Sequence, residues 1–187
     1  DVVRSRGLGD VYKRQLQRFS FSGLPIRGQW IRLDQTLKSL AQYADYPDDV
    51  KRLLGEMFAA VTMVADNLKF SGAVSLQSKG DGALTRSLAE CRDQHYLRGI
   101  AHVATDKAAD IRSSNLADWL GNGQLALSLL PDKSTRMNPY QGLVEIDPAG
   151  LAASLEGYFQ NSEQLRTRLH FASLDGTTTC LLYTSPS

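Results

Sequence analysis

Cysteine is scarce in this chain, since only Cys91 and Cys180 carry thiols among 187 residues. Cys180 lies in a C-terminal tail that we predict below to be non-native, which leaves Cys91 alone. One thiol cannot form an intramolecular disulfide, and such cysteine usage is typical of a reducing compartment. The composition therefore predicts a protein without an internal disulfide.

Long apolar runs and blocks of like charge are also missing. The longest apolar stretch, MFAAVTMVA at residues 57–65, is far too short to cross a bilayer. The formal net charge of +1 includes a basic cluster at the N-terminus, and without that head acidic residues outnumber basic ones by one. The sequence therefore predicts no membrane partner and no nucleic-acid partner.

Sequence motifs for catalysis or metal binding are absent as well. His95, His102 and His170 form no HxxxH or HExxH pair, and no serine occupies a GxSxG elbow. The glycine pairs of GDG (80–82) and GNG (121–123) are typical of a hairpin turn with positive φ and of a helix C-cap, respectively. We therefore expect no catalytic, cofactor-binding or metal-binding residue.

Two kinds of charged residue have an ordinary structural interpretation. Asp48 and Asp49 follow Pro47, where acidic residues favour the start of a helix. Arg27, Arg166 and Arg168 could bind an anion. Scattered arginines, however, usually lie on the solvated surface or pair with acids, and we expect this of all three.

Cys91 supports one alternative function. A small hydrolase or transferase could use its thiol together with His95 or His102 as the base. The sequence around Cys91 names no base, however, and a small buried or edge residue of a strand is the better explanation for it. Apolar packing around Cys91 would argue against the enzyme.

The two ends of the chain are related through the genetic code. Residues 10–15, DVYKRQ, can be encoded by GAT GTG TAT AAG AGA CAG, whose reverse complement, read out of frame, encodes Cys-Leu-Leu-Tyr-Thr-Ser. That string is residues 180–185, and such inverted ends are typical of a transposase sequencing adapter. We therefore predict that residues 1–15 and 180–187 are translated adapter and that residues 16–179 are native.

The remaining pattern predicts a single α+β domain. Apolar residues recur at three- and four-residue steps from Val50 to Leu68 and widen to an almost fully apolar surface, which predicts a central buried helix. A shorter helix is expected at residues 33–43, and others at LADWLG and AGLAASLEGYFQNS. Alternating segments with hairpin-sized turns between them predict antiparallel-rich sheets around the central helix.

Several stretches carry a family resemblance. They are RFSFSGLPIRGQWIRLDQTL, YPDDVKRLLGEMFAAVTMVADNLKFSGAVSLQSKGDGAL, LRGIAHV, LADWLGNGQLALSL, YQGLVEID and YFQNSEQLRTRL. In this order they resemble the N-terminal domain of the heat-shock protein 33 family of bacterial redox-regulated holdase chaperones. The resemblance covers Arg18 to Asp175, and Arg166 departs from it because the family pattern usually has proline there.

The resemblance implies an ATP-independent chaperone of the cytoplasmic stress response. Such a protein binds unfolded or aggregation-prone clients under oxidative stress, passes them to ATP-dependent refolding chaperones and could form a homodimer. The family's zinc, held by Cys-x-Cys and Cys-x-x-Cys, and its disulfides belong to a C-terminal domain that we expect to be missing here by truncation. The sequence does not identify the client-binding residues, and the aromatic or aliphatic candidates Trp30, Ile31, Tyr140 and Phe159 also fit a core.

Overall fold

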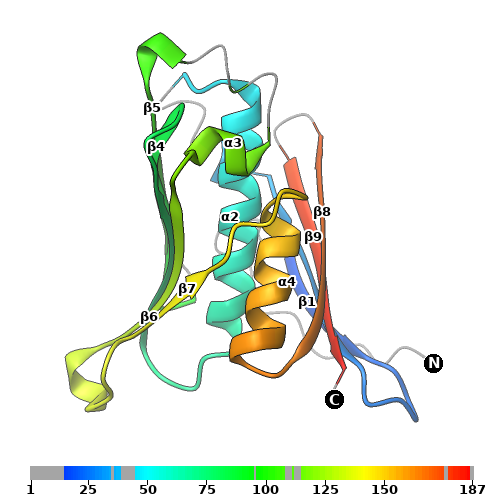
Figure 1. Ribbon diagram of the computed structural model, residues 1–187. Helices are drawn as coiled ribbons and strands as arrows, with labels where there is room; N and C mark the ends of the chain where they lie inside the picture. Colours follow the sequence, from blue (N-terminus) through cyan, green and yellow to red (C-terminus); the bar gives the residue numbers. More distant parts are fainter. Residues whose placement is uncertain are drawn as a thin grey trace.

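The computed structural model describes residues 15–34, 36–38, 45–94, 96–107, 111, 115–174 and 177–185. Two antiparallel sheets face each other, and helices α2 (Asp48–Asp66) and α4 (Leu151–Ser162) lie between them (Figure 1). A short helix, α3 (Leu116–Leu120), and a 3-10 turn, η2 (Lys133–Thr135), connect strands. This arrangement confirms the predicted α+β class.

The larger sheet is built from five strands. Its order is β5 (Tyr96–Val103), β4 (Leu84–Arg92), β3 (Gly72–Lys79), β6 (Gln124–Pro131) and β7 (Tyr140–Val144). The inward side chains of its central strands are mostly apolar, for example Val74 and Leu76 at 0% exposure, and the buried hydroxyls of Ser78 and Ser87 hydrogen-bond to each other at 2.6 Å. β3 and β6 each contain a run of consecutive buried residues, so a strict period-2 pattern describes these strands only in part.

The smaller sheet joins the two ends of the described chain. Its order is β1 (Gln15–Ser20), β2 (Arg27–Leu33), β9 (Thr177–Ser185) and β8 (Arg166–Leu174). β9 lies between β2 and β8, with Cys180 opposite Ile31 and Phe171. The tail assigned to the adapter therefore occupies an inner strand position, and its apolar residues suit that position whatever their origin.

The central helix α2 confirms the strongest prediction from the sequence. It contacts both sheets, and Val61 and Met63 have 0% exposure. Asp48 and Asp49 lie in its first turn, where they pair with Lys51 at 3.2 Å and Arg52 at 2.8 Å. The two aspartates therefore act at the helix start rather than as a catalytic pair.

The GDG and GNG motifs interlock. The backbone N–H groups of Asp81 and Gly82 donate to the carbonyl of Leu120 at 3.0 and 3.2 Å, and Asp81 accepts from the backbone N–H of Asn122 at 2.9 Å. Gly121 caps α3 with φ of 61°, as predicted. The positive φ predicted for the glycines of GDG is wrong: Gly80 and Gly82 are needed because a Cβ would meet the carbonyls of Leu120 and Trp119.

The predicted helix at residues 33–43 is described only in part. Residues 36–38 are helical, and Leu37 is buried in the core. The rest of that prediction falls largely outside the described residues, as do the head at residues 1–14 and His95.

Candidate functional site

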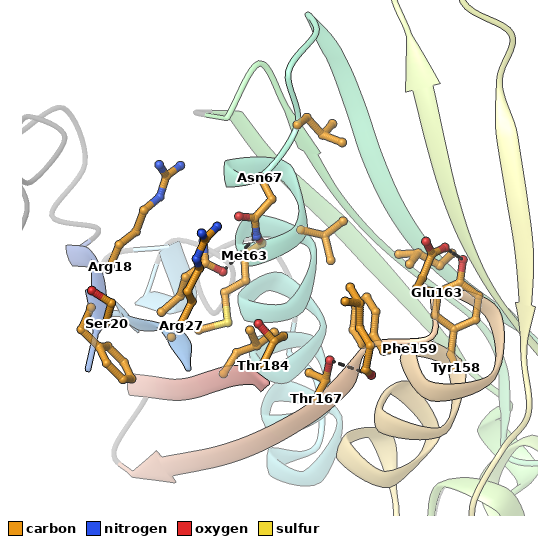
Figure 2. A pocket seen from close by; sticks show the side chains of 18 of the residues that line it. Arg18, Ser20, Arg27, Met63, Asn67, Tyr158, Phe159, Glu163, Thr167 and Thr184 are labelled. Atoms are coloured by element: carbon orange, nitrogen blue, oxygen red, sulfur yellow. Dashed lines mark hydrogen bonds between the residues drawn. The ribbon is translucent and has the colours of Figure 1, made fainter. Parts of the chain in front are cut away.

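A cavity at the C-terminal end of α2 is the candidate site (Figure 2). Its volume is about 680 Å³, a size typical of pockets that bind small molecules or short peptide segments. Both sheets and both long helices contribute to its lining: Arg18, Phe19, Ser20, Arg27, Gly28, Gln29, Met63, Val64, Asn67, Leu68, Leu127, Leu129, Tyr158, Phe159, Glu163, Leu165, Thr167, Leu182 and Thr184.

The interior of this cavity is largely apolar. Met63 and Val64 come from α2, Leu127 and Leu129 from β6, and Phe159 from α4. Val64, Leu129 and Phe159 are only partly buried, although they pack against the core. Apolar surface that is packed on one side and open on the other can bury the apolar side chains of a ligand.

A polar row crosses the smaller sheet at one edge of the cavity. The strand register places Ser20 opposite Arg27, Arg27 opposite Thr184, and Thr184 opposite Thr167. All four line the cavity, so three hydroxyls and one guanidinium border an apolar interior. This row can supply hydrogen bonds at one end of a bound segment.

A buried carboxylate ties the C-terminal end of α2 to β1 and β2. Asp66 Oδ2 accepts from Arg18 Nε and from Gln29 Nε2, each at 2.6 Å. Arg18 Nη2 also donates to the backbone carbonyl of Asp66 at 2.6 Å, and Asn67 Nδ2 donates to Gln29 Oε1 at 3.2 Å. The hydrogen bond to Asp66 raises the pKa of Arg18, so its guanidinium stays charged.

Tyrosines and one glutamate border the opposite side of the cavity. Tyr158 hydroxyl donates to Tyr140 hydroxyl at 3.2 Å or to Glu163 Oε1 at 3.3 Å. Burial and the hydrogen bond with Tyr140 raise the pKa of Tyr158, which keeps its hydroxyl protonated. Gly142 packs directly on the Tyr158 ring, and any larger residue there would place its Cβ within the ring's contact distance.

A second cavity, of about 600 Å³, lies at the N-terminal half of α2. Asp49, Arg52 and Glu56 line it from α2, and His170 lines it from β8. Burial raises the pKa of Glu56 to about 7, and the positive charge of Arg52 opposes this shift. Apolar residues such as Leu116, Trp119 and Phe171 also line this cavity, so it combines titratable and apolar groups, whereas the interior of the first is largely apolar.

The structure separates the residues of the proposed cysteine enzyme. Cys91 has 0% exposure within the apolar core, opposite Val74 and Leu97. His102 is exposed on β5 and lies opposite Arg86. Arg86 is five residues from Cys91 along β4. His95 lies outside the described residues. The packing of Cys91 therefore does not support the hydrolase or transferase alternative.

The other candidates do not converge on one place. On β8, Arg168 pairs with Glu156 at 2.7 Å, His170 stacks on Tyr183, and Arg166 is exposed. Ile31 is a core residue, as its alternative interpretation predicted. Trp30 is half-buried on β2.

Three candidates from the sequence do lie around the first cavity. Arg27 and Phe159 line it, and Tyr140 accepts the hydrogen bond of its lining residue Tyr158. Sequence reasoning missed Met63 and Leu129 as cavity residues, and it missed the hydroxyl residues that share the row of Arg27. The surplus of apolar residues in the second half of α2 was a signal for Met63, and no local pattern indicated the others.

Two antiparallel sheets packed around α2 and α4, with an apolar cavity at the C-terminal end of α2, define a domain of the α+β class. Residues 14–182 match the family model described as Hsp33 protein, so the chain belongs to this family. No helix among the described residues has the length and hydropathy needed to span a membrane.

The relatives share sequence over most of the chain. A 33 kDa chaperonin of Cronobacter sakazakii is 38% identical over 155 residues, which are 83% of this chain and 51% of the relative. A 33 kDa chaperonin of Shewanella denitrificans is 36% identical over 173 residues, or 92% and 58% of the two chains. The chain therefore spans about half the length of these relatives.

A solved structure shares the fold. The 33 kDa chaperonin (heat shock protein 33 homolog) of Thermotoga maritima superimposes with a TM-score of 0.71 over 91% of this chain and 60% of that one, at 16% identity.

The family implies zinc, but the residues present do not fit a zinc site. Structural zinc needs about four cysteine or histidine ligands around one point. Among the residues that the structure describes, no three His, Cys, Asp or Glu side chains gather in this way. Cys91 and Cys180 lie in different sheets, on β4 and β9.

Proposed function

We propose that this chain is the client-binding part of an ATP-independent holdase, which binds unfolded proteins and prevents their aggregation under oxidative stress. Membership of the Hsp33 family and the name 33 kDa chaperonin of its relatives support the chaperone class. The apolar cavity at the end of α2 is the single structural observation that carries the proposal. Unfolded chains expose apolar side chains, and this cavity can bury them.

The same proposal includes the setting of the protein. It acts without a catalytic step, in the cytoplasm, and hands its clients to ATP-dependent refolding chaperones. A homodimer is compatible with this function, and the test below applies to either assembly.

The redox switch is proposed to lie outside this chain. We propose that residues 16–179 are the native chaperone domain, that residues 1–15 and 180–187 are adapter, and that the gene continues into a zinc domain. The fit of residues 180–185 into β9 then reflects their apolar, β-compatible composition. Sequencing outward from the codons of Leu174 to Thr179 should reveal Cys-x-Cys followed by Cys-x-x-Cys, and raw reads that run through both junctions into bacterial sequence would contradict the adapter.

A light-scattering assay with a heat-unfolded enzyme tests the holdase. The intact chain should suppress scattering, and Leu68→Asp should weaken suppression severalfold because it places a charge in the apolar cavity. Leu174→Asp is the matched control, since Leu174 is 76% exposed and lies outside the cavity lining. Equal suppression by both variants would contradict the cavity as client site, and no suppression by the intact chain would contradict the function.

The test requires that Leu68→Asp still folds. Cooperative urea unfolding of both variants checks this. Leu68→Trp provides a second probe, because it fills the cavity without adding a charge and should weaken suppression in the same way.

A further inference from the structure

The charges around the first cavity are unequally compensated. Asp66 is nearly buried, with 5% side-chain exposure, and Arg18 pairs with it at 2.6 Å. Arg18 and Asp66 therefore cancel each other at the edge formed by β1 and β2. Two hydrogen bonds to Asp66 also orient Arg18, so these two guanidinium donors are already used by the C-terminal end of α2.

Arg27 is the uncompensated charge at this edge. It lines the cavity and is exposed, and its guanidinium makes no hydrogen bond or ion pair with any residue that the structure describes. Its cross-strand neighbours in this chain are the hydroxyl residues Ser20 and Thr184, which carry no charge, and Thr184 belongs to the segment that we assign to the adapter. Its guanidinium donors are therefore available to a bound group, and their planar fork matches a carboxylate.

The far side of the cavity carries the opposite sign. Glu163 follows α4 as its C-cap residue and accepts from the Tyr158 hydroxyl at 3.3 Å. Figure 2 shows Arg18 and Arg27 on one side of α2 and Tyr158 and Glu163 on the other. The apolar interior thus lies between a net positive edge and a negative one.

We propose that this cavity selects, among unfolded segments, apolar stretches that carry an acidic group at one end. The inference rests on the proposed function and names its substrate class. The apolar side chains occupy the interior around Val64, Leu129 and Phe159, and the acidic group pairs with Arg27. A basic group in the same place would meet the like charge of Arg27.

Three labelled peptides with one apolar core test this selectivity. They end in two aspartates, two asparagines or two lysines, and their binding to the intact chain is measured by fluorescence anisotropy. We expect the acidic peptide to bind about three- to tenfold more tightly than the basic one, as for a partly exposed ion pair. The difference should shrink in about 0.5 M salt, because the charges remain accessible to counterions.

Variants of β2 assign the selectivity to one side chain. Arg27→Ala should equalise the three affinities, and Arg27→Glu should reverse their order. Arg32→Ala is the matched control, because Arg32 is an exposed arginine of the same strand outside the cavity lining, and it should leave the order unchanged.

The outcomes separate this inference from the proposed function. If all three peptides bind equally, or if Arg27→Ala keeps the preference, the charge selectivity is overturned while the holdase function stands. If no peptide binds and the chain also fails to suppress aggregation, both are overturned.

Discussion

The two ends of α2 open into cavities of similar size but different chemistry. The cavity at the C-terminal end has an apolar interior with Arg27 at its edge, whereas the cavity along the N-terminal half contains Asp49, Arg52, Glu56 and His170. Their volumes are about 680 and 600 Å³. The difference teaches that volume alone does not identify a client site, because an unfolded segment gains most from apolar surface.

Ion pairs at the two ends of the helix differ in the same way. At the N-terminal end, Asp48 and Lys51 pair on the surface, and the Asp48 side chain is 97% exposed. At the C-terminal end, Asp66 is buried and accepts from Arg18 and Gln29. The C-terminal end is therefore anchored to the smaller sheet, and Arg18 and Gln29 of this anchor line the apolar cavity.

The largest expected effect is on this anchor. Asp66→Ala should lower the free energy of unfolding by about 2–3 kcal/mol, because Gln29 loses its buried acceptor and Arg18 its counterion. Asp48→Ala at the other end should lower it by at most about 0.5 kcal/mol, since its ion pair is exposed and only its place in the first turn of α2 contributes. Urea denaturation measures both, and equal losses would contradict the difference between the two ends.

A medium effect is expected from Glu56 in the N-terminal cavity. Burial raises the pKa of Glu56 from 4.5 to about 7, so the folded state binds more protons than the unfolded state between these values. Glu56 therefore stabilises the fold at low pH, and this contribution is lost as the pH rises through 7.

Glu56→Gln measures that contribution. The free energy of unfolding of the parent should fall from pH 5 to pH 8, and the fall should be about 2 kcal/mol smaller in the variant. Urea titrations at each pH measure both. Glu145→Gln, at an exposed glutamate, should leave the pH profile of the parent unchanged. If the parent becomes more stable relative to Glu56→Gln as the pH rises over this range, the raised pKa of Glu56 is contradicted.

The smallest effect is expected from Arg27. Arg27→Ala should leave the unfolding free energy within about 0.5 kcal/mol of the parent, because no described residue pairs with it. Arg18 pairs with Gln29, two residues from Arg27 along β2. Arg18→Ala should lower the free energy of unfolding by about 1–2 kcal/mol, because it leaves Asp66 without its counterion. A larger loss from Arg27→Ala would indicate a structural role for this arginine and weaken its assignment to ligand binding.

The sequence predicted those parts of the fold that depend on local pattern. Val50 to Leu68 repeat at helical steps, and α2 follows from that repetition. The turn at Gly80–Gly82 was predicted for the wrong physical reason, because its glycines avoid the carbonyls of Leu120 and Trp119, which are distant in sequence. β9 was not predicted, because residues 180–187 were excluded as adapter.

The apolar cavity could not be predicted from local pattern. Its lining comes from β1, β2, α2, β6, α4, β8 and β9, and only the strand register brings Ser20, Arg27 and Thr184 into one row. Phe159 was named from its aromatic ring alone, without its place in the cavity. The family resemblance, in contrast, followed from whole segments and is confirmed by the match over residues 14–182.

Site-specific photo-crosslinking tests the central claim most directly. A photoreactive amino acid at position 68, in the apolar cavity, is compared with one at position 152, in the charged cavity, during heat unfolding of a client enzyme. The account predicts client adducts at position 68 and few at position 152. Equal adducts at both positions, or adducts confined to position 152, would contradict the assignment of the client site to the C-terminal end of α2.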